Sequence, residues 1–218
     1  MKRRSSLQAF TLIEMITVIA IIAILAGLIL SVNGLAQRKA ASARAGAEIR
    51  ALSGACEAYK TDNGGYPQNP NITDTLDPRV STVPTGTNYQ NSSQFLYGAL
   101  TGDDGGTSGT SSTNAYNGKI DSGETARNYL PDFFKRSRFD PNYPTNNKVS
   151  YVVDPFGYSY GYSTAGLKAE QDYRVSLLTN PSASRSTAIG YNNTFDLWST
   201  GGATTATTND LGKWVKNW

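Results

Sequence analysis

Hydrophobic and polar positions divide the N-terminal part of the chain into distinct stretches. Residues 1–9 form a short leader that contains three basic residues. An almost unbroken apolar run follows as far as Leu30, and its roughly twenty residues, when helical, match the ~30 Å hydrocarbon core of a bilayer. Because basic flanks stay in the cytoplasm, the pattern predicts a transmembrane segment over residues 10–32, with the rest of the chain across the membrane.

Beyond Val32 the apolar positions are spaced as on an amphipathic helix, and alanine is frequent. No proline interrupts this pattern, and residues 62–65 (DNGG) supply a stop signal. We therefore expect one helix over residues 10 to about 60, whose second part, residues 33–60, packs an apolar stripe against a globular head. Two helices broken at residues 31–34 are the alternative.

The remainder, residues 61–218, has the pattern of a globular head with long polar loops. A short helix is expected over residues 92–100, where apolar residues share one face. The pattern also predicts strands over residues 150–153 and 158–162, joined by a turn, and a further strand around residues 174–178. The predicted fold class is α+β, in which the long N-terminal helix packs on a small C-terminal antiparallel β-sheet.

Charge and residue content exclude several classes of function. The formal net charge is +3, and Lys2, Arg3 and Arg4 of the leader account for all of it. The rest of the chain therefore has no basic excess that would favour nucleic acid. Histidine is absent and Cys56 is the only cysteine, so neither an internal disulfide nor a Cys–His or Ser–His–Asp arrangement can form. We expect a chain that is not an enzyme.

Glu14 is the exceptional residue of the apolar run. A carboxylate in a membrane helix is costly, which favours a functional role; the alternative is that it lies at headgroup depth and stabilises the helix N-terminus. With the basic leader, residues 10–14 (FTLIE) resemble the class III signal of type IV pilins and type II secretion pseudopilins. This resemblance implies that a prepilin peptidase cleaves between Ala9 and Phe10 and N-methylates Phe10. The family usually has glycine where Ala9 stands.

The order of these segments supports the resemblance. An ordinary secretory signal is cleaved directly after its apolar region, but residues 31–37 (SVNGLAQ), which follow the apolar run, contain no Ala-x-Ala site, so the apolar helix would be retained. The resemblance implies that subunits stack through this helix. The Glu14 carboxylate of one subunit would then pair with the Phe10 amine of its neighbour, a contact that fixes register more than it adds stability.

Two further segments resemble the major (G-type) pseudopilin of type II secretion. Residues 154–157 (DPFG) are similar to its Asp-Pro-Trp-Gly turn, and residues 195–201 (FDLWSTG) are similar to its calcium-binding C-terminal loop. The resemblance implies calcium ligands at Asp196, the Ser199 carbonyl, Asn209 and Asp210. Acidic positions of the family pattern are lost here, which would weaken calcium binding. The alternative is a polar loop pinned by Trp198, Trp214 and Trp218.

The resemblance therefore implies a structural subunit of a type II secretion pseudopilus. Such a subunit is a single-pass inner-membrane protein with a cytoplasmic N-terminus and a periplasmic head, and it assembles as a helical homopolymer into a periplasmic fibre. Its expected partners are the prepilin peptidase, minor pseudopilins, the inner-membrane assembly platform and other copies of itself. The alternatives are a type IV pilin for adhesion, motility or DNA uptake, and a membrane-tethered ligand-binding module.

Overall fold

A computed structural model of the chain describes residues 10–80, 84–103, 116, 120, 125–127, 129, 149, 151–186, 188–204 and 210–218. For residues 28–33 of the first helix it describes the backbone alone. The predicted leader, residues 1–9, lies outside the described residues. The chain divides into two compact units, Met1–Ala41 and Ser42–Trp218, and the long N-terminal helix contributes residues to both.

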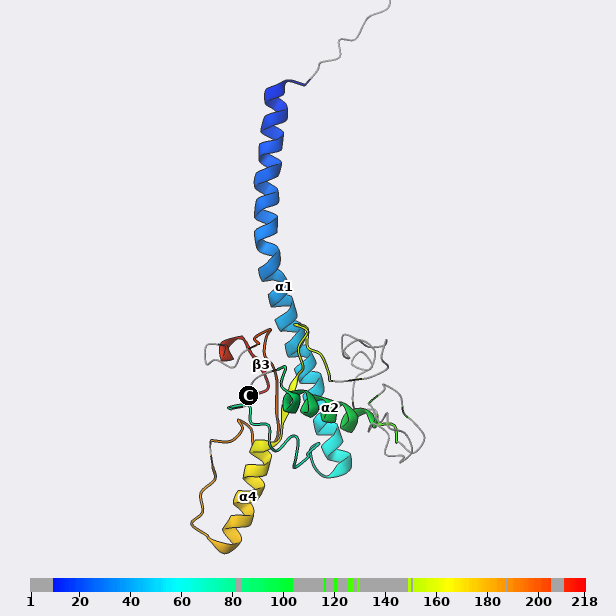
Figure 1. Cartoon of the computed structure of the whole chain (residues 1–218), viewed down its shortest axis with the longest axis vertical. Helices are drawn as coiled ribbons and strands as arrows, with labels where there is room; N and C mark the ends of the chain where they lie inside the picture. Colours follow the sequence, from blue (N-terminus) through cyan, green and yellow to red (C-terminus); the bar gives the residue numbers. More distant parts are fainter. Residues whose placement is uncertain are drawn as a thin grey trace, which may run out of the picture. The chain divides into compact units, whose positions relative to one another are not determined.

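Helix α1 extends from Leu12 to Asn63 and confirms the predicted long helix (Figure 1). Its backbone is helical through residues 31–34, so the alternative of two separate helices is wrong. The predicted stop signal is confirmed as well. Gly64 follows the last helical residue with a φ of +78°, and its N–H donates to the Lys60 carbonyl at 2.8 Å. A left-handed residue of this kind ends a helix most easily when it is glycine.

In the first unit, the N-terminal segment carries a continuous apolar surface. Every described side chain from Phe10 to Gly27 is exposed, including Leu12 at 77% and Ile13 at 65%. Contiguous exposed apolar surface marks an interaction site. No helix within the described residues is long and apolar enough to cross a membrane. The predicted span also includes residues 28–33, whose side chains are not among those described.

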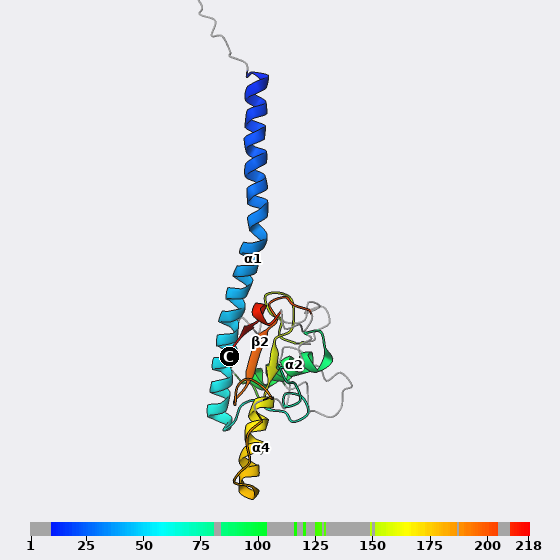
Figure 2. The same ribbon diagram turned by 90° about the vertical axis from the view of Figure 1, so that its left-hand side faces the viewer.

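Three short strands form the antiparallel sheet of the second unit. They are β1 (Gly161–Ser163), β2 (Asp196–Ser199) and β3 (Val215–Lys216), in the order β1-β2-β3. Gly161 pairs with Trp198, which pairs in turn with Lys216. The strands lie beside the part of α1 that belongs to the same unit (Figure 2). The predicted arrangement of a long helix and a small antiparallel sheet is therefore confirmed.

The predicted hairpin immediately precedes this sheet. Val153 and Ser159 form an antiparallel bridge. Between them the Asp154 N–H donates to the Tyr158 carbonyl at 2.7 Å, and the Gly157 N–H donates back to the Asp154 carbonyl at 3.0 Å. The turn is therefore where the sequence predicts it. Both predicted strands are shorter than expected, because regular strand geometry is limited to the bridge and to β1.

The strand predicted around residues 174–178 is wrong, because this segment lies in helix α4 (Ala165–Thr179). Glu170 and Arg174, four residues apart, form an ion pair at 2.8 Å, and a second pair with the same spacing precedes it. Pairs with this spacing meet only on a helix, where they add stability. The apolar residues of this segment indicated a strand, but the charged residues before them follow a helical period.

Helix α2 (Thr87–Thr101) confirms the short helix predicted over residues 92–100. It ends at Gly102, which has a φ of +85° and donates its N–H to the Gly98 carbonyl at 2.8 Å. The helix buries much of its surface, including Leu96, Tyr97 and Leu100. It is therefore the second helix, beside α1, that contributes side chains to the core.

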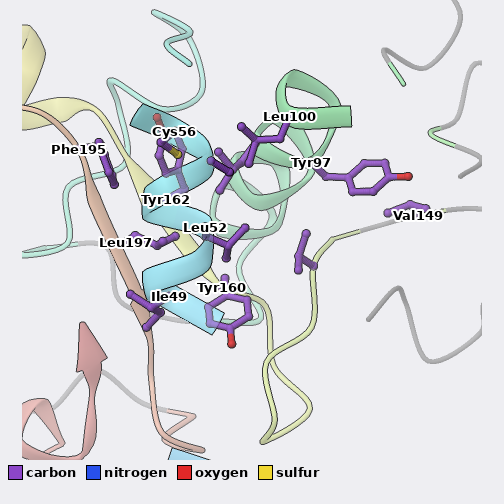
Figure 3. Close-up of a cluster of buried hydrophobic side chains, with 13 residues drawn as sticks. Ile49, Leu52, Cys56, Tyr97, Leu100, Val149, Tyr160, Tyr162, Phe195 and Leu197 are labelled. Atoms are coloured by element: carbon purple, nitrogen blue, oxygen red, sulfur yellow. The ribbon is translucent and has the colours of Figure 1, made fainter. Parts of the chain in front are cut away.

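The main hydrophobic core joins α1, α2 and the sheet region (Figure 3). Its labelled members include Ile49, Leu52 and Cys56 of α1, Tyr97 and Leu100 of α2, and Tyr160, Tyr162, Phe195 and Leu197 from the strands and their flanks. Burial raises the pKa of the Cys56 thiol, which keeps it protonated. Since the thiolate is the reactive form of cysteine, Cys56 acts as a small core residue.

A second cluster lies on the opposite face of β2, because successive strand residues point to opposite sides. Leu197 belongs to the main core, whereas its neighbour Trp198 packs with Tyr89 and Trp214. The Trp198 and Trp214 rings are stacked, with centroids 6.0 Å apart, and Trp218 packs against the same cluster. The three tryptophans named in the alternative interpretation of the C-terminal loop therefore pack together in the second unit.

Candidate assembly site

Thr11 and Glu14 form a reciprocal capping arrangement at the start of α1. The Thr11 N–H and hydroxyl both donate to Glu14 Oε2, at 2.8 and 2.7 Å. The Glu14 N–H donates in return to Thr11 Oγ1 at 3.3 Å. This is the capping-box pattern, in which two side chains satisfy N–H groups that the first helical turn leaves unpaired. It holds the carboxylate of Glu14 beside the helix N-terminus, where the helix dipole favours negative charge.

Glu14 is also the only charged residue between Phe10 and Gln37. It therefore places a single negative charge on an exposed apolar surface. The bonds from Thr11 are sufficient while the site faces water, but burial of that surface against a partner would remove the carboxylate from solvent. A buried carboxylate is stable only with a cation or several hydrogen bonds. The site is thus chemically suited to receive an ammonium group during association.

The predicted cleavage residues lie directly ahead of this arrangement. Phe10 has an exposed side chain, at 80%, and both Phe10 and Thr11 precede the first helical residue. Ala9 lies outside the described residues, so cleavage between Ala9 and Phe10 stays a prediction. A new amine on Phe10 would arise four residues before Glu14, close to one helical turn.

Comparison with protein families bears on this segment. Residues 4–30 match the family described as the prokaryotic N-terminal methylation motif. The chain carries a prepilin-type N-terminus. A prepilin-type N-terminus indicates a type IV pilin-like substrate of prepilin peptidase, with a membrane-anchored precursor. Searches of curated proteins and of solved structures gave no significant match.

The matched region contains the candidate assembly site and ends within the first unit. It includes Ala9, Phe10, Thr11 and Glu14, and it does not extend into the second unit. A prepilin-type N-terminus is therefore established independently of the head. The distinction between a pseudopilin and a pilin must come from features outside the match.

Asp196 is one of the four implied calcium ligands. In the second unit, both of its carboxylate oxygens already accept hydrogen bonds from the backbone. It is the first residue of β2, and its two carboxylate oxygens accept the backbone N–H groups of Tyr191 and Asn192 at 2.8 and 2.9 Å. Burial raises the pKa of Asp196, while these two hydrogen bonds oppose the shift. Asp196 therefore fastens the loop that leads into β2.

The other implied ligands lie beyond the far end of β2. Ser199 is the last residue of the strand, and its hydroxyl donates to Asp154 Oδ2. Asp210 forms an ion pair with Lys213, in which Nζ and Oδ1 are 2.8 Å apart. Asn209 lies outside the described residues.

Asp196 does not share a calcium ion with ligands at the Ser199 end of β2. Asp196 and Ser199 are three strand residues apart, which corresponds to about 10 Å along β2. Oxygens that share a calcium ion each lie about 2.3–2.6 Å from it, so Asp196 cannot join ligands at the Ser199 end. Among the described residues, no group of three or more acidic, cysteine or histidine side chains is placed to hold a metal ion.

Sequence reasoning missed two structural roles. Thr11 was read only as part of the family signal, although a threonine three residues before a glutamate is itself a capping-box pattern. Asp154 was assigned only to a turn. Its buried bond to Ser199 depends on the tertiary fold, and no local pattern would have revealed it.

Proposed function

We propose that this chain is the structural subunit of a type II secretion pseudopilus, processed by a prepilin peptidase and assembled through its N-terminal helix. The observation that carries this proposal is the apolar, exposed first unit with its single carboxylate, Glu14, behind a prepilin-type N-terminus. A surface of this kind is unsuited to a free monomer in water. It suits a subunit that is stored in a membrane and later covered by copies of itself.

Assembly would divide the energetic roles between apolar contact and charge. Large aliphatic side chains gain roughly 1.5–3 kcal/mol each when they leave water, so contact among the helices supplies the stability of the fibre. The Phe10 amine of one subunit and the Glu14 carboxylate of its neighbour would form a desolvated pair. Such pairs contribute little net stability but disfavour every register that leaves a charge unpaired.

The partners follow from the same proposal. A prepilin peptidase would remove the leader and methylate Phe10 in the inner membrane. An inner-membrane assembly platform would extract the subunit, and minor pseudopilins would join the periplasmic fibre. The head would face the periplasm, and the chain itself would supply no catalysis. The absence of histidine and the buried state of Cys56 support this non-enzymatic role.

Features of the head favour a pseudopilin over a type IV pilin. Many type IV pilins close their C-terminal region with a disulfide, whereas Cys56 is a single buried thiol within α1. The C-terminal segment here is instead fixed by the cluster around Trp198 and Trp214. The turn at residues 154–157 is also similar to that of the major pseudopilin. Imaging separates the candidates, because a pilin forms long external filaments and a pseudopilin forms a short periplasmic fibre.

The decisive test is Glu14→Gln, which keeps the shape of the side chain but removes its charge. We expect normal cleavage and methylation of Phe10, measured by mass spectrometry of the mature N-terminus, together with at least a tenfold loss of fibres. A tenfold change corresponds to about 1.4 kcal/mol at one contact, which repeats along the fibre.

The matched control is Asp172→Asn on α4, which removes an exposed carboxylate from the second unit. This variant should form fibres at the wild-type level. Normal fibres from Glu14→Gln would contradict the proposed pairing, and an unprocessed Met1 in the wild-type protein would contradict the prepilin assignment as a whole.

A further inference from the structure

The C-terminal loop, residues 200–214, joins β2 to β3, and the structure describes its two ends, residues 200–204 and 210–214. The family resemblance implies that this loop binds calcium, but Asp196 lies too far from the Ser199 end of β2 to share an ion with ligands there. Asp196 is engaged at the opposite end of β2 by the N–H groups of Tyr191 and Asn192. One implied carboxylate, Asp210, remains near the loop.

Lys213 places a positive charge beside Asp210. Its ammonium nitrogen is 2.8 Å from Asp210 Oδ1, and its backbone N–H donates to the Asp210 carbonyl at 2.9 Å. The Asp210 side chain is only 14% exposed, whereas that of Lys213 is 60% exposed. A carboxylate that is mostly withdrawn from water is thus neutralised by a side chain of the same turn, the short helix η1 (Leu211–Lys213) and its cap.

The two ends of the loop also meet through their backbones. Gly201 has a φ of +64°, and a Cβ at this position would lie 2.1 Å from the Lys213 carbonyl oxygen. The Gly201 N–H donates to Ser199 Oγ at 3.1 Å, and the Ser199 hydroxyl donates to the buried carboxylate of Asp154. This series of bonds fastens the start of the loop to the hairpin, next to the point where Lys213 holds its end.

We propose that the C-terminal loop closes without a divalent cation, because the Lys213 ammonium supplies the positive charge at Asp210 and the Asp154–Ser199–Gly201 bonds fix the other end. The head of this chain then folds independently of calcium, in contrast to what the family resemblance implies. This inference concerns the second unit alone, so it holds or fails separately from the proposed assembly function.

The tryptophans give a direct readout, since Trp198, Trp214 and Trp218 lie in or against one cluster at this loop. Thermal unfolding of the full chain in detergent would be followed by tryptophan fluorescence, in millimolar calcium and in excess chelator. We expect the wild-type midpoint to differ between these conditions by less than about 1 °C. Titration calorimetry with calcium alone should detect no saturable binding.

Substitutions then test the role of Lys213. Lys213→Ala should lower the midpoint by about 1–4 °C, and Lys213→Arg, which keeps the positive charge, should restore most of that loss. The matched control is Lys168→Ala, which removes the lysine of another short-range ion pair, on α4. It should leave the tryptophan signal of the folded protein unchanged, because α4 contributes no residue to the tryptophan cluster.

Two results would overturn the proposal. A rise of several degrees in the wild-type midpoint on adding calcium, with saturable binding in calorimetry, would show that the loop takes a metal ion after all. A Lys213→Ala midpoint equal to that of the wild type would show that the ammonium group has no part in closing the loop.

Discussion

The buried carboxylate of Asp154 is stabilised by three hydrogen bonds within the second unit. Its Oδ1 accepts the N–H groups of Phe156 and Tyr158 at 2.9 and 2.8 Å, and its Oδ2 accepts the Ser199 hydroxyl. Burial raises the pKa of Asp154, and these three hydrogen bonds oppose the shift. Glu48, another buried carboxylate, adds to the increase. The residue thus fixes the hairpin turn and the end of β2 at the same time.

The pH dependence of stability should reveal this burial. A carboxyl whose pKa is higher in the folded than in the unfolded chain stabilises the fold in its protonated form. That contribution is complete below the unfolded value of about 3.9 and is lost as the pH rises through the folded pKa. The free energy of unfolding of the wild type, minus that of Asp154→Asn, should therefore fall as the pH rises above about 4. Urea titrations at several pH values measure this difference, and a constant or rising difference would contradict it.

The lack of a side chain at Gly161 leaves room for the indole ring of Trp198. A Cβ at Gly161 would lie 2.2 Å from Cε2 of Trp198, its partner in the sheet. Gly161→Ala should therefore destabilise the fold by about 1–3 kcal/mol, because the indole or the strand must shift. Gly54 is the matched control, since it lies in α1 with open space where its Cβ would be. Gly54→Ala should stabilise by about 0.5–1 kcal/mol, and chemical denaturation compares the two.

At the scale of elements, α1 performs different work in its two parts. Its residues in the second unit present Ile49, Leu52 and Cys56 to the main core. In the first unit, the described large apolar side chains of α1, from Leu12 to Leu25 and at Leu35, are exposed. One continuous helix therefore contributes core side chains in the second unit and an uncovered apolar surface in the first.

Substitution of one leucine in each unit should separate these roles. Leu52 is fully buried, and Leu52→Ala should lower the free energy of unfolding by about 2–5 kcal/mol. Leu35 is 67% exposed, and Leu35→Ala should leave unfolding unchanged while it reduces fibre yield. Denaturation in detergent and quantitative imaging of fibres measure the two effects. Equal loss of stability in both variants would contradict this division.

The elements that the sequence predicts well are those whose signal is local. α1 is predictable from the spacing of its apolar residues, from its lack of proline and from residues 62–65, which end it. The turn at residues 154–157 is predictable because Asp, Pro and Gly each favour turn conformations. α4 was missed because a few apolar residues at 174–178 outweighed the helical spacing of Glu170 and Arg174. The pairing of β2 with β1 and β3 depends on contacts between distant segments, which no local pattern contains.

The residues of the candidate sites also differ in whether their roles follow from local sequence or from tertiary contacts. Glu14 stands out in the sequence because a lone acid in an apolar run is costly, and its place at the start of α1 needs only the helix. The calcium set required four residues to converge in space. Asp196 accepts hydrogen bonds from the loop before β2 and Asp210 pairs with Lys213, and neither of these partners can be read from a local pattern.

At the scale of the whole molecule, the two units differ in what they require from their surroundings. The second unit encloses two hydrophobic clusters, one on each face of β2. The first unit exposes its apolar residues and has a single carboxylate among them. Under the proposed function, the head would fold around its own clusters, and lipid or other copies would cover the apolar surface of the first unit. This division is consistent with the proposed passage from membrane to fibre.

The reciprocal bonds of Thr11 and Glu14 have a consequence for how such a fibre would grow and shorten. In an isolated subunit, the Glu14 carboxylate already accepts two hydrogen bonds from Thr11. Joining a neighbour would exchange these hydrogen bonds for the pair with the neighbour's Phe10 amine. A subunit that departs recovers the original set at once. In the proposed fibre, this contact would therefore favour neither addition nor removal of a subunit, and the direction of growth would come from another step of assembly.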